Sequence, residues 1–251
     1  MNQFTDPNQI NVPYDIVRLP SKGLFYKNEV KEVKVTYLNA SDENLLSSQN
    51  IIQSGDIIDE LLKRKIVGSD IRVEEMLECD KQAVLIFLRN TSFGPSYEAT
   101  YTDPKTNEKF DVTHDLSSIS FKEFELTPDQ NGEFEFVTPI TNKTIKFKFL
   151  TSQQEKELVN LKEHYVGNQV VPTVTKRLEL LIQEIDGNRD KNTLSQIIQT
   201  MPIKDSQEFR NYVVKNKPGL DLSFTVKAPS GEEFTTQVVL GATFFRPFFG
   251  I

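Results

Sequence analysis

Helical and strand-forming patterns occupy separate stretches of this chain, and this segregation constrains the fold more than any other sequence feature. Strands that alternate with helices build a doubly wound parallel sheet, whereas separate runs of strands and helices build an α+β fold. We therefore expect an α+β fold with antiparallel β regions. The predicted segments are an irregular N-terminal arm (1–28), a strand with a helical block (29–94), a β region (95–150), a second helical block (151–217), and a β-hairpin with an aromatic C-terminal tail (218–251).

The first helical block combines one strand pattern with two helix patterns. Apolar and polar residues alternate over 30–37, which predicts a half-buried strand. Apolar residues at helical spacing then predict a helix from about residue 55 to 67. Asp80 is a suitable N-cap for a further helix ending near Gly94, and residues 83–88 are apolar on nearly every side. That helix is expected to be buried at the centre of the molecule.

The second helical block carries two capping-box patterns. Ser152 and Glu155 have the required spacing, and so do Asp205 and Glu208. The predicted helices cover about 153–165, 173–186, 193–201 and a stretch from Asp205 to the break at Pro218.

The arm ends in a turn that is a candidate partner-binding element. Its residues are Leu19, Pro20, Ser21, Lys22 and Gly23. Pro20 keeps the preceding residue extended and Gly23 can adopt a positive φ, so a tight turn is expected between two extended pieces. We predict that this turn docks the arm on the helical block by burying Leu19 together with Leu24 or Phe25. An ordinary surface turn would have the same sequence requirements.

The C-terminal tail is a second candidate partner-binding element. Its candidate residues are Phe244, Phe245, Arg246, Phe248 and Phe249. So many aromatic rings are costly to leave in water and must be covered. Either a partner covers them or the tail completes the core of the chain itself, and both alternatives remain open at this stage.

Two stretches of the chain resemble each other. Residues 100–110 and 225–234 each contain a strand, a turn with proline, an acidic residue and a phenylalanine before a second strand. The spacing resembles that of zinc-ribbon hairpins, but no cysteine stands in either turn, and we predict no zinc site. Two unrelated hairpins with common turn residues would look similar as well.

No constellation of residues indicates catalysis. His114 and Asp115 are neighbours in a predicted strand and point to opposite faces, which suits a structural or surface histidine. Cys79 has no basic neighbour to activate it, and His164 has no second histidine at metal-binding spacing. The sequence thus predicts no catalytic residue, cofactor or metal. The alternatives are a hydrolase whose carboxylates meet only in three dimensions, or a metal-free binding module derived from a zinc ribbon.

Composition narrows the class of protein. A net charge of −7 argues against a nucleic-acid partner, because binding to a nucleic acid relies on Lys and Arg side chains that neutralise its phosphates. The short basic run at residues 63–65 is expected to form the solvated face of its helix. A single cysteine fits a reducing compartment, and no apolar run is long enough to span a membrane. No pattern indicates a small-molecule ligand.

The order of several short motifs resembles a known viral family. The motif at 19–23 (LPSKG) precedes a strand, the sequence at 39–43 (NASDE) and the helix beginning near 54–62. Residues 77–94 continue the likeness, which is clearest over 18–101. The pattern is similar to the baseplate hub and hub-assembly family of T-even-type contractile-tailed bacteriophages.

This resemblance implies a structural or assembly role in the baseplate hub, with other baseplate hub and tail-assembly proteins as partners. It implies a protein made late in infection, found in the host cytoplasm during assembly or in the virion tail baseplate. The resemblance leaves open whether the chain is a permanent component or a transient chaperone. Many members of the family carry Arg where this chain has Lys81, and some carry cysteine knuckles that are absent here.

Overall fold

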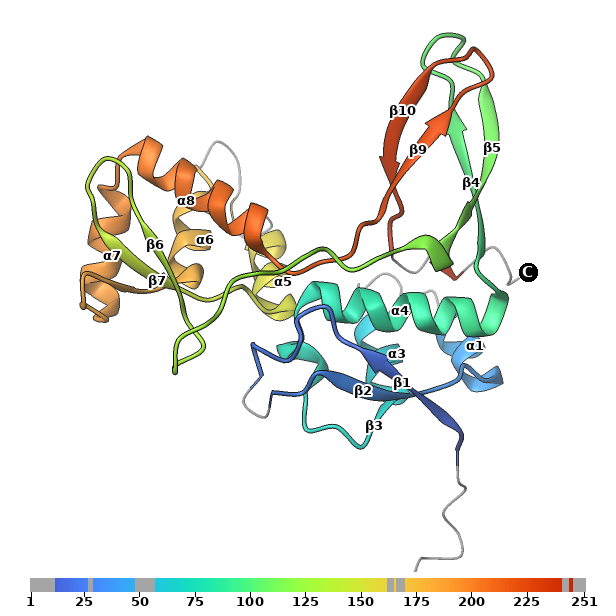
Figure 1. The fold of residues 1–251 in the computed structure, drawn as a ribbon, viewed down its shortest axis with the longest axis horizontal. Coiled ribbons are helices and arrows are strands. Elements are labelled where there is room, and N and C mark those ends of the chain that lie inside the picture. The colour runs from blue at the N-terminus through green and yellow to red at the C-terminus, as the bar shows by residue number, and fades with distance from the viewer. Residues whose placement is uncertain are drawn as a thin grey trace, which may run out of the picture.

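A long helix, α4 (Glu78–Phe93), crosses the middle of the molecule and touches its three parts (Figure 1). An N-terminal lobe lies below it, a second lobe lies at one end, and a projection of two β-hairpins rises above the other end. The computed structural model describes residues 12–26, 29–47, 57–161, 165, 170–240 and 244–245. Its helices and small antiparallel sheets confirm the predicted α+β class.

The N-terminal lobe packs short helices against a three-stranded antiparallel sheet with the order β1-β2-β3. Its elements are β1 (Tyr14–Arg18), β2 (Glu32–Thr36), α1 (Ala40–Ser47), α3 (Ile57–Lys65), β3 (Ile66–Val67) and a 3-10 turn, η1 (Val73–Glu75). The strand predicted over 30–37 is β2. The helix predicted over 55–67 corresponds to α3 up to Lys65, but the prediction is wrong for Ile66–Val67, which pair with β2 as β3. Val35, Leu61 and Val84 are completely buried where the sheet, α3 and α4 meet.

The prediction of an irregular arm over 1–28 is wrong for Tyr14–Arg18, because these residues form β1. They pair with β2 along its whole length, with Val17 opposite Val33 in the core. Alternation over only five residues is a weak local signal, and the strand depends on the partner that it meets in the fold. Residues 1–11 and 27–28 lie outside the described part of the chain.

Helix α4 is the central buried helix that the sequence predicts, but Asp80 does not cap it. The N-cap lies three residues earlier, at Leu77, which makes no side-chain capping bond. Nine of its 16 residues are buried, and Gly94 ends it with a φ of +79°. The carboxylate of Asp80 instead accepts a hydrogen bond from Ser21 N in the Leu19–Gly23 turn.

The second lobe is a three-stranded antiparallel sheet, β6-β7-β8, covered by helices. Its elements are β6 (Phe134–Val137), β7 (Thr144–Phe147), α5 (Ser152–Asn160), α6 (Thr173–Leu181), β8 (Ile182–Ile185), α7 (Lys191–Gln199) and α8 (Ile203–Asn216). Ile145, Phe147 and Phe209 are completely buried between the sheet and α8.

Three predictions for this lobe need correction. The helix predicted over 173–186 ends at Leu181, because Ile182–Ile185 pairs with β7 and buries both of its isoleucines. The capping box at the start of α5 uses Thr151 and Gln154, one residue earlier than predicted. Asp205 lies inside the first turn of α8 and accepts hydrogen bonds from Ile140 N and Thr141 N, at 2.7 and 3.0 Å.

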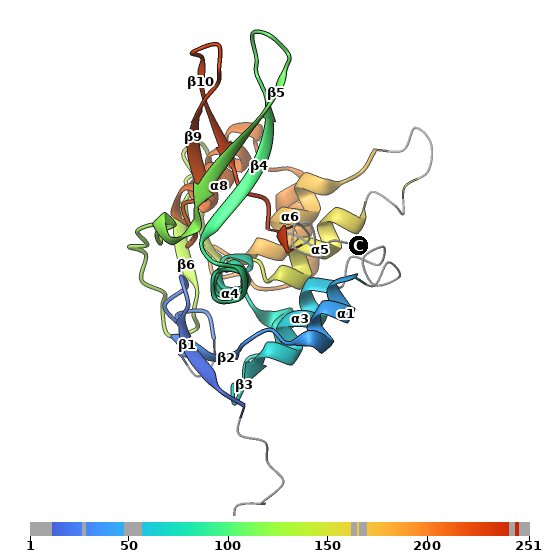
Figure 2. The same ribbon diagram turned by 90° about the vertical axis from the view of Figure 1, so that its right-hand side faces the viewer.

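Two hairpins distant in sequence form the projection (Figures 1 and 2). The first consists of β4 (Ser96–Thr102) and β5 (Lys109–Asp115), followed by the 3-10 turn η2 (Leu116–Ser118); the second consists of β9 (Ser223–Lys227) and β10 (Glu233–Gln237). Each hairpin is a separate two-stranded sheet, and the two lie face to face. These are the two similar stretches of the sequence, and the fold places them side by side.

Candidate interaction surfaces

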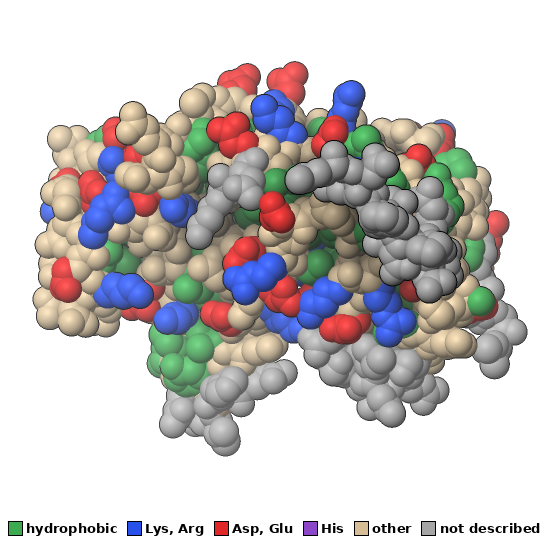
Figure 3. All heavy atoms as spheres, turned by 90° about the horizontal axis from the view of Figure 1, so that it is seen from below, with side chains coloured by type: hydrophobic (Ala, Val, Ile, Leu, Met, Phe, Trp, Pro, Cys, Tyr) green, Lys and Arg blue, Asp and Glu red, His purple; other side chains and the backbone are tan. Residues whose placement is uncertain are grey.

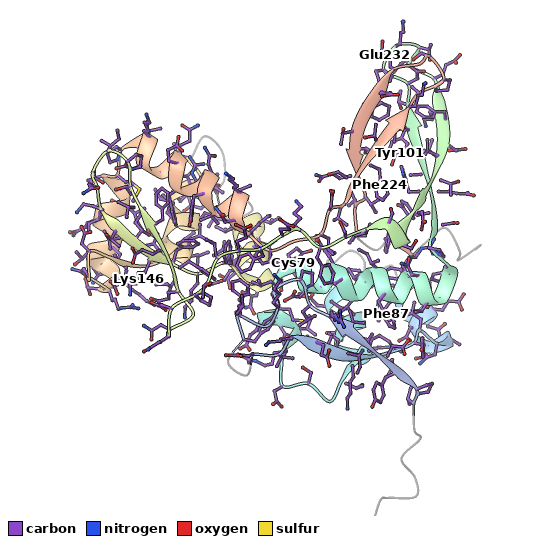
Figure 4. The ribbon with its side chains drawn as sticks, viewed as in Figure 1. Cys79, Phe87, Tyr101, Lys146, Phe224 and Glu232 are labelled. Atoms are coloured by element: carbon purple, nitrogen blue, oxygen red, sulfur yellow. The ribbon has the colours of Figure 1, made fainter. Side chains whose placement is uncertain are left out.

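Aromatic side chains join the two hairpins of the projection. Residues on each strand are alternately exposed and half-buried, so one face of each hairpin turns inward. The Tyr101 and Phe234 ring centroids are 6.0 Å apart, and those of His114 and Phe224 are 4.5 Å apart. Figure 4 shows Tyr101 and Phe224 inside the projection and Glu232 at its tip. The projection is therefore one packed unit, although its own core is small.

A buried carboxylate closes the tip of the projection. Asp103 accepts hydrogen bonds from Ser230 N at 3.0 Å, from Ser230 Oγ at 2.8 Å and from Lys105 N at 2.8 Å. Burial opposes its charged form, but these hydrogen bonds keep the pKa of Asp103 below its ordinary value. The turns of the two hairpins that resemble zinc-ribbon hairpins in sequence are thus joined by hydrogen bonds to one carboxylate. Among the described residues, no group of three or more His, Cys, Asp or Glu side chains could hold a metal ion.

His114 belongs to the inner face of the projection. Its Nε2 lies 2.7 Å from the Tyr101 hydroxyl, and the ring is buried. Burial lowers the pKa of His114, which favours the neutral ring. This environment agrees with the structural histidine that its sequence context indicated.

The described part of the aromatic tail fills the space between the projection and α4. Phe244 and Phe245 are both completely buried. The Phe244 ring lies 5.3 Å from the Tyr97 ring and 5.9 Å from the Arg89 guanidinium. Arg89 also donates to the carbonyl groups of Gly94 and Ser96, which fixes the chain where α4 leads into β4.

For these two phenylalanines the structure thus shows the second alternative, in which they complete the chain's own core. Arg246, Phe248 and Phe249 lie outside the described residues, and their partner-binding role stays a prediction.

The Leu19–Gly23 turn packs inside the molecule and buries Leu19, as expected, whereas Leu24 and Phe25 are only partly buried. Leu19, Pro20 and Ser21 are buried, whereas the Lys22 side chain is exposed and donates to Phe124 O at 3.3 Å. Gly23 has a φ of +76°, and a Cβ atom there would lie 2.6 Å from Glu29 O. A partner-binding role for the turn stays a prediction; within the chain it packs against both lobes.

Asp80 is the anchor of this turn. Its carboxylate accepts a hydrogen bond from Ser21 N at 2.9 Å and a very short one from the Tyr26 hydroxyl, and its own side chain is completely buried. The neighbouring Phe25 ring lies 5.5 Å from the Phe149 ring of the second lobe. One turn therefore connects α4 with the cores of both lobes.

Two hollows lie between the lobes. The larger, of about 580 Å³, is lined by Tyr26, Asp129, Lys148 and neighbouring residues. The smaller, of about 250 Å³, contains Glu78 and Glu155, but both oxygens of Glu155 accept from Arg177 at 2.8 Å. Burial and the adjacent Asp80 raise the pKa of the Cys79 thiol, which is the opposite of what a nucleophile requires.

Charges of both signs are interspersed on the underside of the molecule (Figure 3). Lys63 forms ion pairs with Glu60 at 3.2 Å and with Glu74 at 2.8 Å. The prediction that residues 63–65 form a solvated face is wrong for Lys65, which is buried and paired with Asp42. No helix in the described part of the chain is long and apolar enough to cross a membrane.

Sequence reasoning did not identify the residues that join the parts of the molecule, among them Asp80, Asp103, Arg89 and Ser230. The sequence signal for any of these contacts was the likeness of the two hairpins. That likeness predicted neither that the hairpins pack together nor that Ser230 donates hydrogen bonds to Asp103.

Comparison with known proteins assigns the chain to a family. No curated protein and no solved structure matches the chain significantly. A family model for the T4 bacteriophage base plate protein matches residues 14–246, which include both lobes, α4 and the projection. The chain belongs to the T4 bacteriophage base plate protein family.

Proposed function

We propose that this baseplate protein builds the central hub of the tail baseplate, as a hub component or as an assembly factor, through protein–protein contacts. Membership in the family makes it a structural protein of the phage tail baseplate that interacts with other phage proteins. The resemblance of residues 18–101 to hub and hub-assembly proteins supports the hub as the place of action.

The projection is the observation that carries this proposal. It stands away from both lobes, so its outer faces are free to contact a partner (Figures 1 and 2). Lys105 and Glu232 are exposed near its tip, while the Asp103–Ser230 bonds hold the two turns together. A rigid exposed element loses little conformational entropy on binding, which favours affinity.

Charge reversal at the tip tests the projection. The double variant Lys105→Glu/Glu232→Lys is expected to bind purified hub proteins of the same phage about tenfold more weakly, because rim charges steer and orient association. Its melting temperature should be unchanged, since both side chains are exposed and the Asp103 bonds remain. Lys204→Glu, at an exposed position of the second lobe, is the matched control. Unchanged affinity of the double variant would contradict the role of the projection.

The two forms of the proposal differ in the fate of the protein. A hub component remains in purified virions, whereas an assembly factor is present in infected-cell lysate and missing from virions. Quantitative mass spectrometry of both samples separates these outcomes. Normal hubs formed in infections that lack the protein would contradict either form.

Truncation of the tail tests its last residues separately from the buried pair. Deleting residues 246–251 should weaken binding to hub proteins and leave the fold intact, because the contacts of Phe244 and Phe245 remain. Phe244→Ala should instead lower the free energy of unfolding by about 3–5 kcal/mol, the usual cost of removing a buried phenylalanine. Thermal unfolding and binding are measured on both variants. If the truncated chain binds hub proteins normally, the tail is not an anchor.

A further inference from the structure

Strand β1 is an edge of the N-terminal sheet, because no other strand in the described part of the chain pairs with its outer side. The sheet has the order β1-β2-β3, and Figure 2 shows β1 on its outer side. Leu19 N donates to Lys31 O at 2.9 Å, in register with the pairing of β1 and β2. Hydrogen-bonding direction alternates along an antiparallel strand, so odd-numbered residues face β2. The N–H and C=O groups of Tyr14, Ile16 and Arg18 therefore point to the open edge.

The side chains of the same residues lie on the solvent face of the sheet. Ile16 is 56% exposed and Tyr14 is 44% exposed, and the amine of Lys34 lies 4.9 Å from the Tyr14 ring centroid. An edge strand with exposed apolar side chains is a template for pairing with another strand. Pro13 and Pro20 flank β1, so the stretch available for pairing is the strand itself.

We propose that a second copy of this chain pairs with β1 in antiparallel orientation, with Ile16 opposite Ile16 of the second copy on a twofold axis. This inference goes beyond the role in the hub. Ile16 is the middle residue of β1, so this register uses the whole strand. It also places Tyr14 opposite Arg18 of the second copy, twice by symmetry, which is a favourable cation–π pairing.

Neighbouring registers are less favourable. Centring the pair on Asp15 would set two carboxylates against each other, and centring it on Arg18 would do the same with two guanidinium groups. Like charges directly opposite each other destabilise an antiparallel pair. A shift toward Pro20 would also lose a hydrogen bond, because proline has no N–H. The strand is therefore self-complementary about Ile16, which is what an isologous twofold interface requires.

Complementary charges at position 16 test this geometry on the full-length chain. The wild-type protein should show a concentration-dependent dimer by sedimentation equilibrium. Ile16→Asp and Ile16→Lys should each raise the dimer dissociation constant about tenfold or more, because like charges would then meet on the twofold axis. An equimolar mixture of the two variants should regain a one-to-one heterodimer. Ile203→Asp, at a position that is 83% exposed on α8, is the matched control and should dimerise normally.

Three results would overturn the proposal. The first is a wild-type chain that stays monomeric at all concentrations. The second is a dimer whose dissociation constant is unchanged by both Ile16 variants, and the third is an equimolar mixture of the variants that forms no heterodimer. Loss of binding to a purified hub protein by Ile16→Asp, with a monomeric wild type, would assign the edge to that partner instead. Melting curves of each variant confirm folding, as expected for an exposed side chain. The hub-binding measurements on the projection are independent of these outcomes.

Discussion

Replacing Asp80 with alanine is expected to lower the free energy of unfolding by about 3–5 kcal/mol. The carboxylate is completely buried and accepts from Ser21 N and the Tyr26 hydroxyl. Alanine would leave both donors without their acceptor, and Ser21 is completely buried, so its N–H group could not bind water instead. Because the turn contacts both lobes, its release would loosen the connection between them. Urea unfolding followed by circular dichroism measures the change.

Asp80→Asn is the matched control for this prediction. Its amide oxygen can still accept from Ser21 N, and the side chain has nearly the same shape. Its cost should be less than half that of the alanine variant. If Asp80→Ala costs under about 1 kcal/mol, the bonds to the turn are not what holds the lobes together.

Gly23→Ala should destabilise the chain by about 3 kcal/mol or more. The left-handed φ of +76° is unfavourable for alanine, and the new Cβ would lie 2.6 Å from Glu29 O and 2.8 Å from the carbonyl carbon of Val30. These contacts are with backbone atoms and not with the end of a flexible side chain, so the main chain itself would have to shift, and the clash adds to the cost of the conformation.

Gly187→Ala separates these two contributions. Gly187, in the turn after β8, has nearly the same φ, +82°, but a Cβ atom there would meet nothing within 4 Å. Its substitution should cost only about 1–2 kcal/mol, the price of the left-handed conformation. Urea unfolding measures both variants. If they lose the same free energy of unfolding, the close contact at Gly23 does not contribute to the cost.

Helices with long apolar periodicity could be predicted from the chain alone, and the reason is that their signal is local. Residues 83–88 are apolar nearly all round, and α4 is indeed buried at the centre. The turn at Gly23 could be predicted for a similar reason, because its backbone conformation excludes most other residues. The α+β class followed from the order of such segments and is confirmed.

Capping residues were harder to predict, because one residue type serves two purposes. Asp80 and Asp205 have the sequence context of N-caps, yet both bind backbone N–H groups of distant segments. A carboxylate accepts equally well from the first turn of its own helix or from a loop that the fold brings near. Residues 182–185 show the same ambiguity, since their apolar spacing fits a helix until β7 offers hydrogen bonds and a core to fill.

Local patterns along the chain were enough to establish the fold class, the main helices, the strained turn and the motif order of the baseplate family. They could not establish which segments meet. The two hairpins are separated by more than a hundred residues, and their pairing through Tyr101, Phe234 and Asp103 depends on how α4 and the lobes position them. The burial of Phe244 and the exposure of Ile16 on an edge strand likewise depend on how the fold positions the elements around them. Burial and exposure are properties of neighbours in space, and periodicity along a chain reports only the face that a residue occupies.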